Sequence, residues 1–112
     1  MAAASDTSTT VFRALADPTR RAVLEHLSRA PASVGELAQP FDMALPSFMQ
    51  HLKVLEASGL VRSRKTGRVR TYRIAPAPLR DAEDWLARQR SVWERRLDQF
   101  DAYVTALQED RP

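Results

Sequence analysis

The sequence contains no cysteine, which excludes disulfide bonds and thiolate metal sites. Histidine is also scarce, and His26 and His51 are the only imidazoles that could ligate a metal. No apolar run approaches the length of a membrane-spanning helix, and the polar residues 1–10 lack the apolar core of a signal peptide. We therefore expect a cytoplasmic protein with no metal, no cofactor and no membrane partner.

Acidic residues are missing from one long stretch of the chain. Between Glu56 and Asp81 there are none, although the formal net charge is only +3. The same stretch holds seven basic residues: Arg62, Arg64, Lys65, Arg68, Arg70, Arg73 and Arg80. The rest of the chain has ten basic and fourteen acidic residues, a balance of −4. A positive surface on a slightly acidic body is what binding to a polyanion requires.

The length of 112 residues suits one domain, and the chain shows no internal repeat and no low-complexity linker. We expect a disordered tail over residues 1–9 and a main folded part over residues 10–76. A long C-terminal helix over residues 77–112 should belong to the same domain.

Helix signals follow one another along the first half of the chain. A short helix from Val11 should end near Asp17, which is a plausible N-cap for a second helix. Ser33 and Glu36 form a capping box that starts a third helix. A longer helix should run from about residue 45 to residue 58. Its buried face consists of apolar residues at i, i+4 and i+7: Phe48, Leu52 and Leu55.

A basic hairpin should follow the longer helix. Two strands, 60–65 and 68–74, flank Thr66-Gly67, which we interpret as a two-residue turn. This register places Val61 opposite Tyr72 as an apolar cross-strand pair. It also places Lys65 opposite Arg68 at the hairpin tip. Folding alone disfavours two like charges in this position, whereas a bound polyanion would favour them.

A short helix, a turn, a longer helix and a basic hairpin are the layout of a winged helix-turn-helix, a mainly α fold with a small β-hairpin. In this fold the longer helix enters the DNA major groove, and the hairpin lies along the backbone or in the minor groove. We therefore predict double-stranded DNA as the partner. The predicted contact residues are Ala44, Leu45, Ser47, Met49, Gln50 and Lys53 on the helix, and Arg64, Lys65, Arg68 and Arg70 on the hairpin.

Three side chains of the longer helix have two interpretations each. Gln50 can read adenine through two hydrogen bonds, or it can be a solvated surface residue. Met49 can contact a thymine methyl group, or it can pack against the neighbouring helix. His51 flanks the buried face. It can form a hydrogen bond within the protein scaffold, or it can contact a phosphate.

The last helix carries an apolar stripe with a seven-residue repeat, which is typical of helix-to-helix packing. About thirty residues correspond to ~45 Å of helix, more than so small a domain can cover. Together with the first helix, this long dimerisation helix should form the interface of a homodimer. The predicted interface residues are Val11, Phe12, Leu15, Leu86, Trp93, Leu97, Phe100, Val104 and Leu107.

Two separated segments resemble the ArsR-type family of regulators. Phe12 to Arg21 reads FRALADPTRR, and His51 to Val61 reads HLKVLEASGLV, followed by the basic hairpin and a closing YRI. The resemblance covers roughly residues 10–75. It implies a homodimeric winged helix-turn-helix repressor that acts at its own or a neighbouring promoter.

The chain departs from the metal-sensing pattern of that family. Many members use a Cys-containing motif on the helix before the recognition helix, where this chain has residues 34–39 and no Cys. Others use His and Asp on the last helix, which has no His here. The resemblance therefore transfers no metal ligand, and the identity of any effector stays open.

Two functions fit these patterns. The first is a sequence-specific DNA-binding transcriptional regulator that acts on an inverted-repeat operator. The second is a winged-helix dimer whose hairpin contacts an acidic protein partner. The acid-free hairpin and Gln50 favour DNA, whereas the apolar Ala44, Leu45 and Met49 fit a protein partner. No catalytic constellation and no glycine-rich phosphate loop is present, so we do not expect an enzyme.

Overall fold

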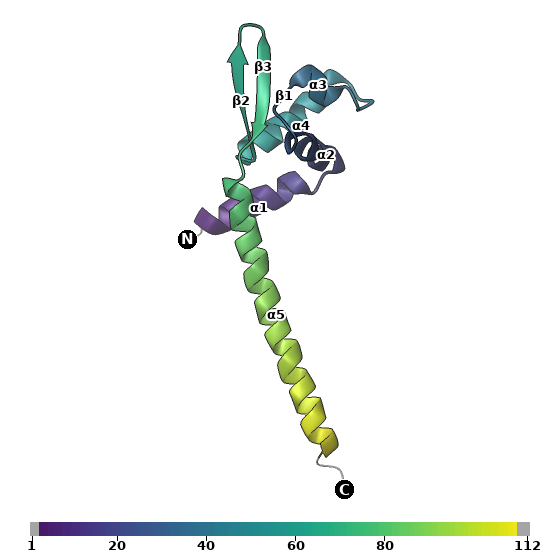
Figure 1. The fold of residues 1–112 in the computed structure, drawn as a ribbon, viewed down its shortest axis with the longest axis vertical. Helices are drawn as coiled ribbons and strands as arrows, with labels where there is room; N and C mark the ends of the chain where they lie inside the picture. Colours follow the sequence, from purple (N-terminus) through teal and green to yellow (C-terminus); the bar gives the residue numbers. More distant parts are fainter. Residues whose placement is uncertain (1–2, 110–112) are drawn as a thin grey trace. The chain divides into compact units, whose positions relative to one another are not determined.

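The structure is a computed structural model that describes residues 3–109, and Figure 1 shows their helices and strands. The helices are α1 (Ala3–Leu15), α2 (Pro18–Leu27), α3 (Val34–Ala38), α4 (Leu45–Ala57) and α5 (Ala77–Glu109), and the strands are β1 (Ala32–Ser33), β2 (Val61–Thr66) and β3 (Val69–Ile74). These residues fall into two units, one through Ala82 and one from Glu83 on. The fold is the predicted mainly helical winged helix-turn-helix with a long C-terminal helix.

Helix α1 begins earlier than the sequence predicts. It starts at Ala3, inside the stretch 1–9 that we expected to be a disordered tail; residues 1–2 lie outside the described residues. Ser8, Val11 and Ala14 are buried on it, three residues apart and therefore on one face. One member of this stripe is a serine in a Ser/Thr-rich segment, so hydrophobic periodicity did not reveal it.

The helix caps lie where the local signals predict them. Asp17 accepts a hydrogen bond from the backbone N–H of Arg20 at 3.1 Å, and Pro18 opens α2. At α3 the Ser33 hydroxyl accepts from the Glu36 N–H at 3.2 Å, and the Glu36 carboxylate accepts from the Ser33 N–H at 3.0 Å. The capping box is therefore confirmed.

A three-stranded antiparallel sheet follows in the order β1-β3-β2. Its hairpin, β2 and β3 with their turn, is the wing (residues 61–74). Strand β1 was not predicted, because two residues are too few to show a periodicity. It pairs Ala32 with Tyr72 and Ser33 with Thr71, and so joins the segment before α3 to the wing.

The predicted register of the wing was wrong. The two-residue turn is Gly67-Arg68, one residue later than expected, so Val61 faces Ile74 and not Tyr72. Gly67 has a φ of 63°, and nothing lies within 4 Å of where its Cβ would be. A glycine with positive φ at the first turn position is typical of a type II′ hairpin, and this fixes where the turn begins.

The hydrophobic core lies in the first unit. It is built from buried side chains of all five helices and all three strands that the structure describes, with Ala82 as the contribution of α5: Val11, Ala14, Val23, Leu27, Ala32, Leu37, Phe48, Leu52, Leu55, Leu60, Val61, Tyr72 and Ala82. Gly59, with a φ of 79°, ends α4 and turns the chain into the sheet. The core therefore holds α4 and the wing together.

Helix α5 has 33 residues, which corresponds to ~50 Å at the usual helical rise. In the second unit six of its large apolar side chains are about half to two-thirds exposed: Leu86, Trp93, Leu97, Phe100, Tyr103 and Leu107. The predicted long helix is confirmed through Glu109. Over the residues described, no helix combines the length and the apolar character needed to cross a membrane.

Candidate nucleic-acid interface

Helix α4, the recognition helix of the predicted fold, has one buried and one exposed face. Phe48 and Leu52 have no exposed surface and pack into the core. Ser47, Gln50 and Lys53 are exposed on the other side. Within the part of the chain that the structure describes, these three side chains form no hydrogen bond and no ion pair. They are free to contact an external partner.

Two apolar side chains of α4 differ in their surroundings. Met49 is partly buried and packs against the core, which supports the packing interpretation over contact with a thymine methyl group. Leu45, at the start of the helix, is 55% exposed. Of the two, only Leu45 presents most of its side chain to an external partner.

The N-terminus of α4 has no side-chain cap. Ala44 occupies the N-cap position with extended backbone (φ −62°, ψ 142°), and its methyl group cannot accept a hydrogen bond. The first N–H groups of a helix have no partner inside the helix. They can therefore donate to external oxygen atoms such as those of a phosphate.

Arg20 connects three helices. Its Nε donates to the backbone carbonyl of Ala14 at 2.7 Å, and its Nη2 donates to that of Arg13 at 2.8 Å, at the end of α1. Its Nη1 lies 3.3 Å from Nδ1 of His51 on α4. Because a guanidinium can only donate, Nδ1 of His51 is the acceptor in this contact. The contact supports the scaffold role of His51 over a phosphate contact.

Asp17 completes this cluster. Its carboxylate lies 3.7 Å from Nδ1 of His51. Burial raises the pKa of Asp17, but the Arg20 N–H, the electrostatic interaction with His51, the Thr19 N–H and the charge of Arg20 together lower it below its ordinary value of 3.8. The carboxylate is therefore ionised at neutral pH, where it caps α2.

The strand register divides the wing into two faces. On the inner face Val61 and Tyr72 are buried against the helices. On the outer face Arg62, Arg64 and Arg73 are exposed. The predicted contact residues lie along the exposed part of the wing: Arg64, Lys65, Arg68 and Arg70.

A hydrogen-bonded chain fixes the wing to the end of α4. Ser63 donates to the Glu56 carboxylate at 3.1 Å, and Arg70 donates to the Ser63 hydroxyl at 2.9 Å. Burial, and then the nearby Glu56 carboxylate, raise the pKa of Tyr72 above its ordinary value of 10.0. Sequence reasoning missed Glu56 and Ser63, because no local pattern marks a contact between a helix and a strand. Arg70 therefore helps to orient the wing, in addition to contributing a positive charge.

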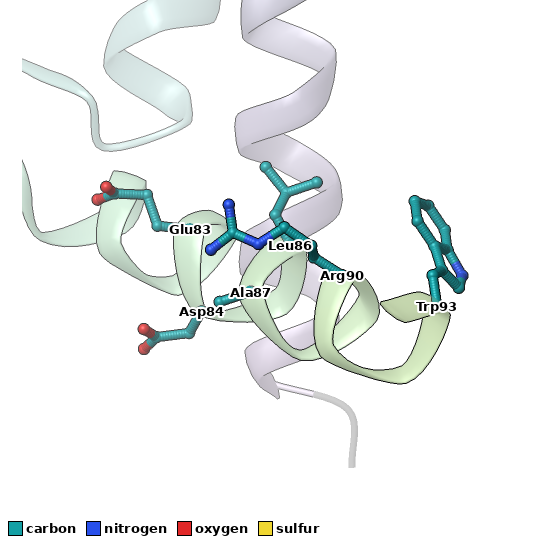
Figure 2. Close-up of a pocket in the computed structure, with 6 residues that line it drawn as sticks. All are labelled: Glu83, Asp84, Leu86, Ala87, Arg90 and Trp93. Atoms are coloured by element: carbon teal, nitrogen blue, oxygen red, sulfur yellow. The ribbon is translucent and has the colours of Figure 1, made fainter. Parts of the chain in front are cut away.

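The predicted interface residues fall into two groups. Val11 is fully buried in the protomer's own core, so it belongs to the core and not to an exposed surface, whereas Phe12 and Leu15 are half-buried. The α5 residues of the prediction are exposed, apart from the half-buried Val104. Figure 2 shows a hollow along α5 lined by apolar and charged side chains: Leu86, Ala87, Trp93, Glu83, Asp84 and Arg90.

Metal-binding groups do not gather in the described part of the chain. No three His, Asp or Glu side chains lie close enough there to hold an ion.

The candidate site consists of the exposed face of α4 and the acid-free wing. These two features define a winged helix-turn-helix regulator.

Known proteins share this arrangement. The family described as "Helix-turn-helix domain" matches residues 15–64, from the end of α1 to the middle of β2. The HTH-type transcriptional regulator Rv2034 of Mycobacterium tuberculosis is 46% identical over 68 residues, which cover 61% of this chain and 64% of that protein. The transcriptional repressor SdpR of Bacillus subtilis is 30% identical over 76 residues, which cover 68% of this chain and 84% of SdpR.

Solved structures agree with these relatives. A crystal structure of an ArsR family transcriptional regulator is 58% identical with a TM-score of 0.77, over 80% of this chain and 93% of that chain. A solution structure of a homodimeric winged helix-turn-helix DNA-binding domain from Mycobacterium bovis is 30% identical with a TM-score of 0.63, over 88% of each chain. The chain belongs to the ArsR family of transcriptional regulators, which are not enzymes.

Proposed function

We propose that this protein is a DNA-binding repressor that recognises an imperfect inverted-repeat operator as a homodimer. The observation that carries the proposal is the exposed, unpaired polar face of α4 beside a wing without acidic residues. Polar side chains on such a helix read base edges in the major groove, while cations on the wing neutralise phosphates.

Each exposed residue of α4 has a distinct task in this proposal. Gln50 can form two hydrogen bonds with adenine, and Lys53 can reach guanine or a phosphate. Ser47 can accept or donate a hydrogen bond at a base edge. The uncapped N–H groups of Leu45 and Ser47 can donate to backbone phosphates, whereas Pro46 has no N–H.

The homodimer is proposed from the apolar stripe of α5. Trp93, Leu97 and Phe100 each expose about three-fifths of their surface. In a monomer this apolar strip would remain in contact with water and would promote aggregation. Phe12 and Leu15 would add to the interface, whereas Val11 would not. The homodimeric state of the M. bovis domain supports this arrangement, and the repressor name of SdpR supports repression.

Dimer geometry then sets the operator. A twofold pair presents two copies of α4 to successive major grooves on one face of the duplex, about 34 Å apart. The two half-sites should therefore be inverted and separated by one helical turn.

A gel shift with the DNA upstream of the protein's own gene tests the proposal. With excess nonspecific competitor, we expect a discrete complex whose footprint contains an imperfect inverted repeat. A transcription assay on the same DNA should then give less transcript when protein is added. If the nonspecific competitor abolishes the complex completely, recognition is not sequence-specific. That outcome would favour the alternative function, a winged-helix dimer with an acidic protein partner.

A further inference from the structure

The outer face of the wing carries a second cationic surface, away from the exposed face of α4. We propose that Arg62, Arg73 and Arg80, the basal cluster, bind the phosphate backbone of DNA that flanks the operator. This inference rests on the proposed DNA-binding function and extends it, because it assigns these three arginines a contact outside the half-sites.

The basal cluster lines one hollow. The hollow has a volume of about 310 Å³ and lies where β3 passes into α5. Besides the three arginines, only residues of the segment 74–77 line it, and none of these is acidic. Guanidinium groups are planar forks of donors that match phosphate oxygens, so the lining has the chemistry of a phosphate site.

The three charges are placed where folding alone disfavours them. Arg62 and Arg73 are direct cross-strand partners on the same face of the sheet, and like charges in that position destabilise a sheet. Arg80 lies in the first turn of α5, where the helix dipole favours an anion. None of the three side chains has a hydrogen bond or an ion pair with any residue that the structure describes. A bound anion would remove both penalties.

The shape of the charged surface favours a linear polyanion. A second hollow, of about 170 Å³, also contains Arg62 and Arg73 and adds Arg64 from β2. Arg62 and Arg64 are two residues apart on one strand, hence about 7 Å along it. The arginines therefore form a row from the start of α5 along the outer face of the wing. Such a row fits successive phosphates of a nucleic-acid strand better than one small ion.

The position of the row explains why it would serve flanking DNA. The inner face of the wing packs on the helices through Val61 and Tyr72, so the outer face is directed away from α4. DNA that runs past the wing would meet this face without its bases being read. The basal cluster should thus add affinity that depends on duplex length and salt, but not on sequence.

The test uses full-length protein and two operator duplexes. The short duplex contains only the two half-sites, and the long one adds about one helical turn on each side. The variant is R73A/R80A, and the matched control is R88A/R95A, which removes the same charge from exposed positions on α5. For the long duplex we expect R73A/R80A to bind more weakly than wild type, with the slope of log K against log salt reduced by about 0.9 for each lost contact.

The short duplex provides the discriminating result. R73A/R80A should bind it as tightly as wild type and the control do, and its Tm should not fall, because R73A removes a like-charge pair. Equal weakening on both duplexes, or no change on either, would overturn the inference. A site for a free small anion is the other source of phosphate chemistry. Inorganic phosphate that raises the Tm of wild type but not of the variant, with unchanged DNA binding, would also overturn it.

Failure of the proposed function would look different. In that case wild type itself would not bind the short duplex specifically. The length dependence and its loss in R73A/R80A can still be measured on duplexes of unrelated sequence, because a backbone contact needs no operator.

Discussion

Nη1 of Arg20 lies 3.3 Å from Nδ1 of His51, and this contact joins the start of α2 to the recognition helix. The same guanidinium donates to the last carbonyls of α1. The two segments that carry the family resemblance, Phe12 to Arg21 and His51 to Val61, therefore meet in space. Through this contact α4 is tied to α1 and α2.

Replacing His51 by Ala should lower both stability and operator affinity. The substitution leaves a partly buried donor of Arg20 without its acceptor, which costs about 1–3 kcal/mol. Urea unfolding measures the first effect and gel shift the second. His51→Gln keeps an acceptor and should recover much of both. If affinity falls in H51A while the free energy of unfolding is unchanged, His51 contacts a phosphate directly and is not a scaffold residue.

A pair of substitutions at Ala44 tests the direction in which α4 points. Ser and Asp are both good N-caps, so A44S and A44D should each raise the free energy of unfolding, by about 0.5–2 kcal/mol. Asp also brings a negative charge to the end of the helix that should face phosphates. We therefore expect A44D to bind the operator more weakly than A44S. Equal affinities would mean that this end of α4 faces away from DNA.

Gln50→Ala should relax the preference at one base pair in each half-site. A bidentate contact with adenine contributes about 1–3 kcal/mol of discrimination. Binding to a set of single-base operator variants measures it, and Lys53→Ala serves as the comparison for a phosphate contact. If all variants lose affinity equally in Q50A, Gln50 does not read a base.

The wing should bind DNA without regard to sequence. R64A/K65A/R68A should weaken binding to operator and unrelated duplexes alike and flatten the salt dependence by about 0.9 in slope for each lost phosphate contact. Arg70 is left in place because it holds Ser63, and through it Glu56 on α4. An unchanged slope in this variant would show that these three residues do not touch the backbone.

Charges placed in the α5 stripe should separate the protomers. Trp93→Glu and Phe100→Glu each put a carboxylate into the proposed seam, and burying it unpaired costs several kcal/mol. Both positions are exposed in the protomer, so we expect folded monomers in size-exclusion chromatography. In a gel shift these monomers should have little operator affinity. Arg95→Glu, on the opposite side of α5, is the control. Folded dimers of unchanged mass in both variants would move the interface elsewhere.

Local signals predicted much of this fold because their causes are local. The caps at Asp17 and Ser33 depend on atoms three residues away, and the end of α4 at Gly59 depends on one backbone angle. The exposed face of α4 follows from helical periodicity around its buried side chains. All of these elements could be placed within one or two residues.

Long-range contacts and ambiguous turns could not be predicted in this way. Arg20 and His51 are 31 positions apart, and no periodicity relates them. A turn at Thr66-Gly67 and one at Gly67-Arg68 are equally short, and a glycine suits the second position of the first turn as well as the first position of the second. The assignment of Val11 to an interface failed for a related reason. An apolar residue on a short helix looks the same whether its own core or a second protomer covers it.

The exposed face of α4 is separate from the contacts that hold α4 in place. Ser47, Gln50 and Lys53 bond to no other described residue, whereas His51, Glu56 and the core side chains fix the helix. Surface substitutions of this kind usually change stability by no more than about 0.5 kcal/mol. Duplicated copies of the gene can therefore diverge toward new promoters through a few changes on one helix, while the scaffold remains under independent selection.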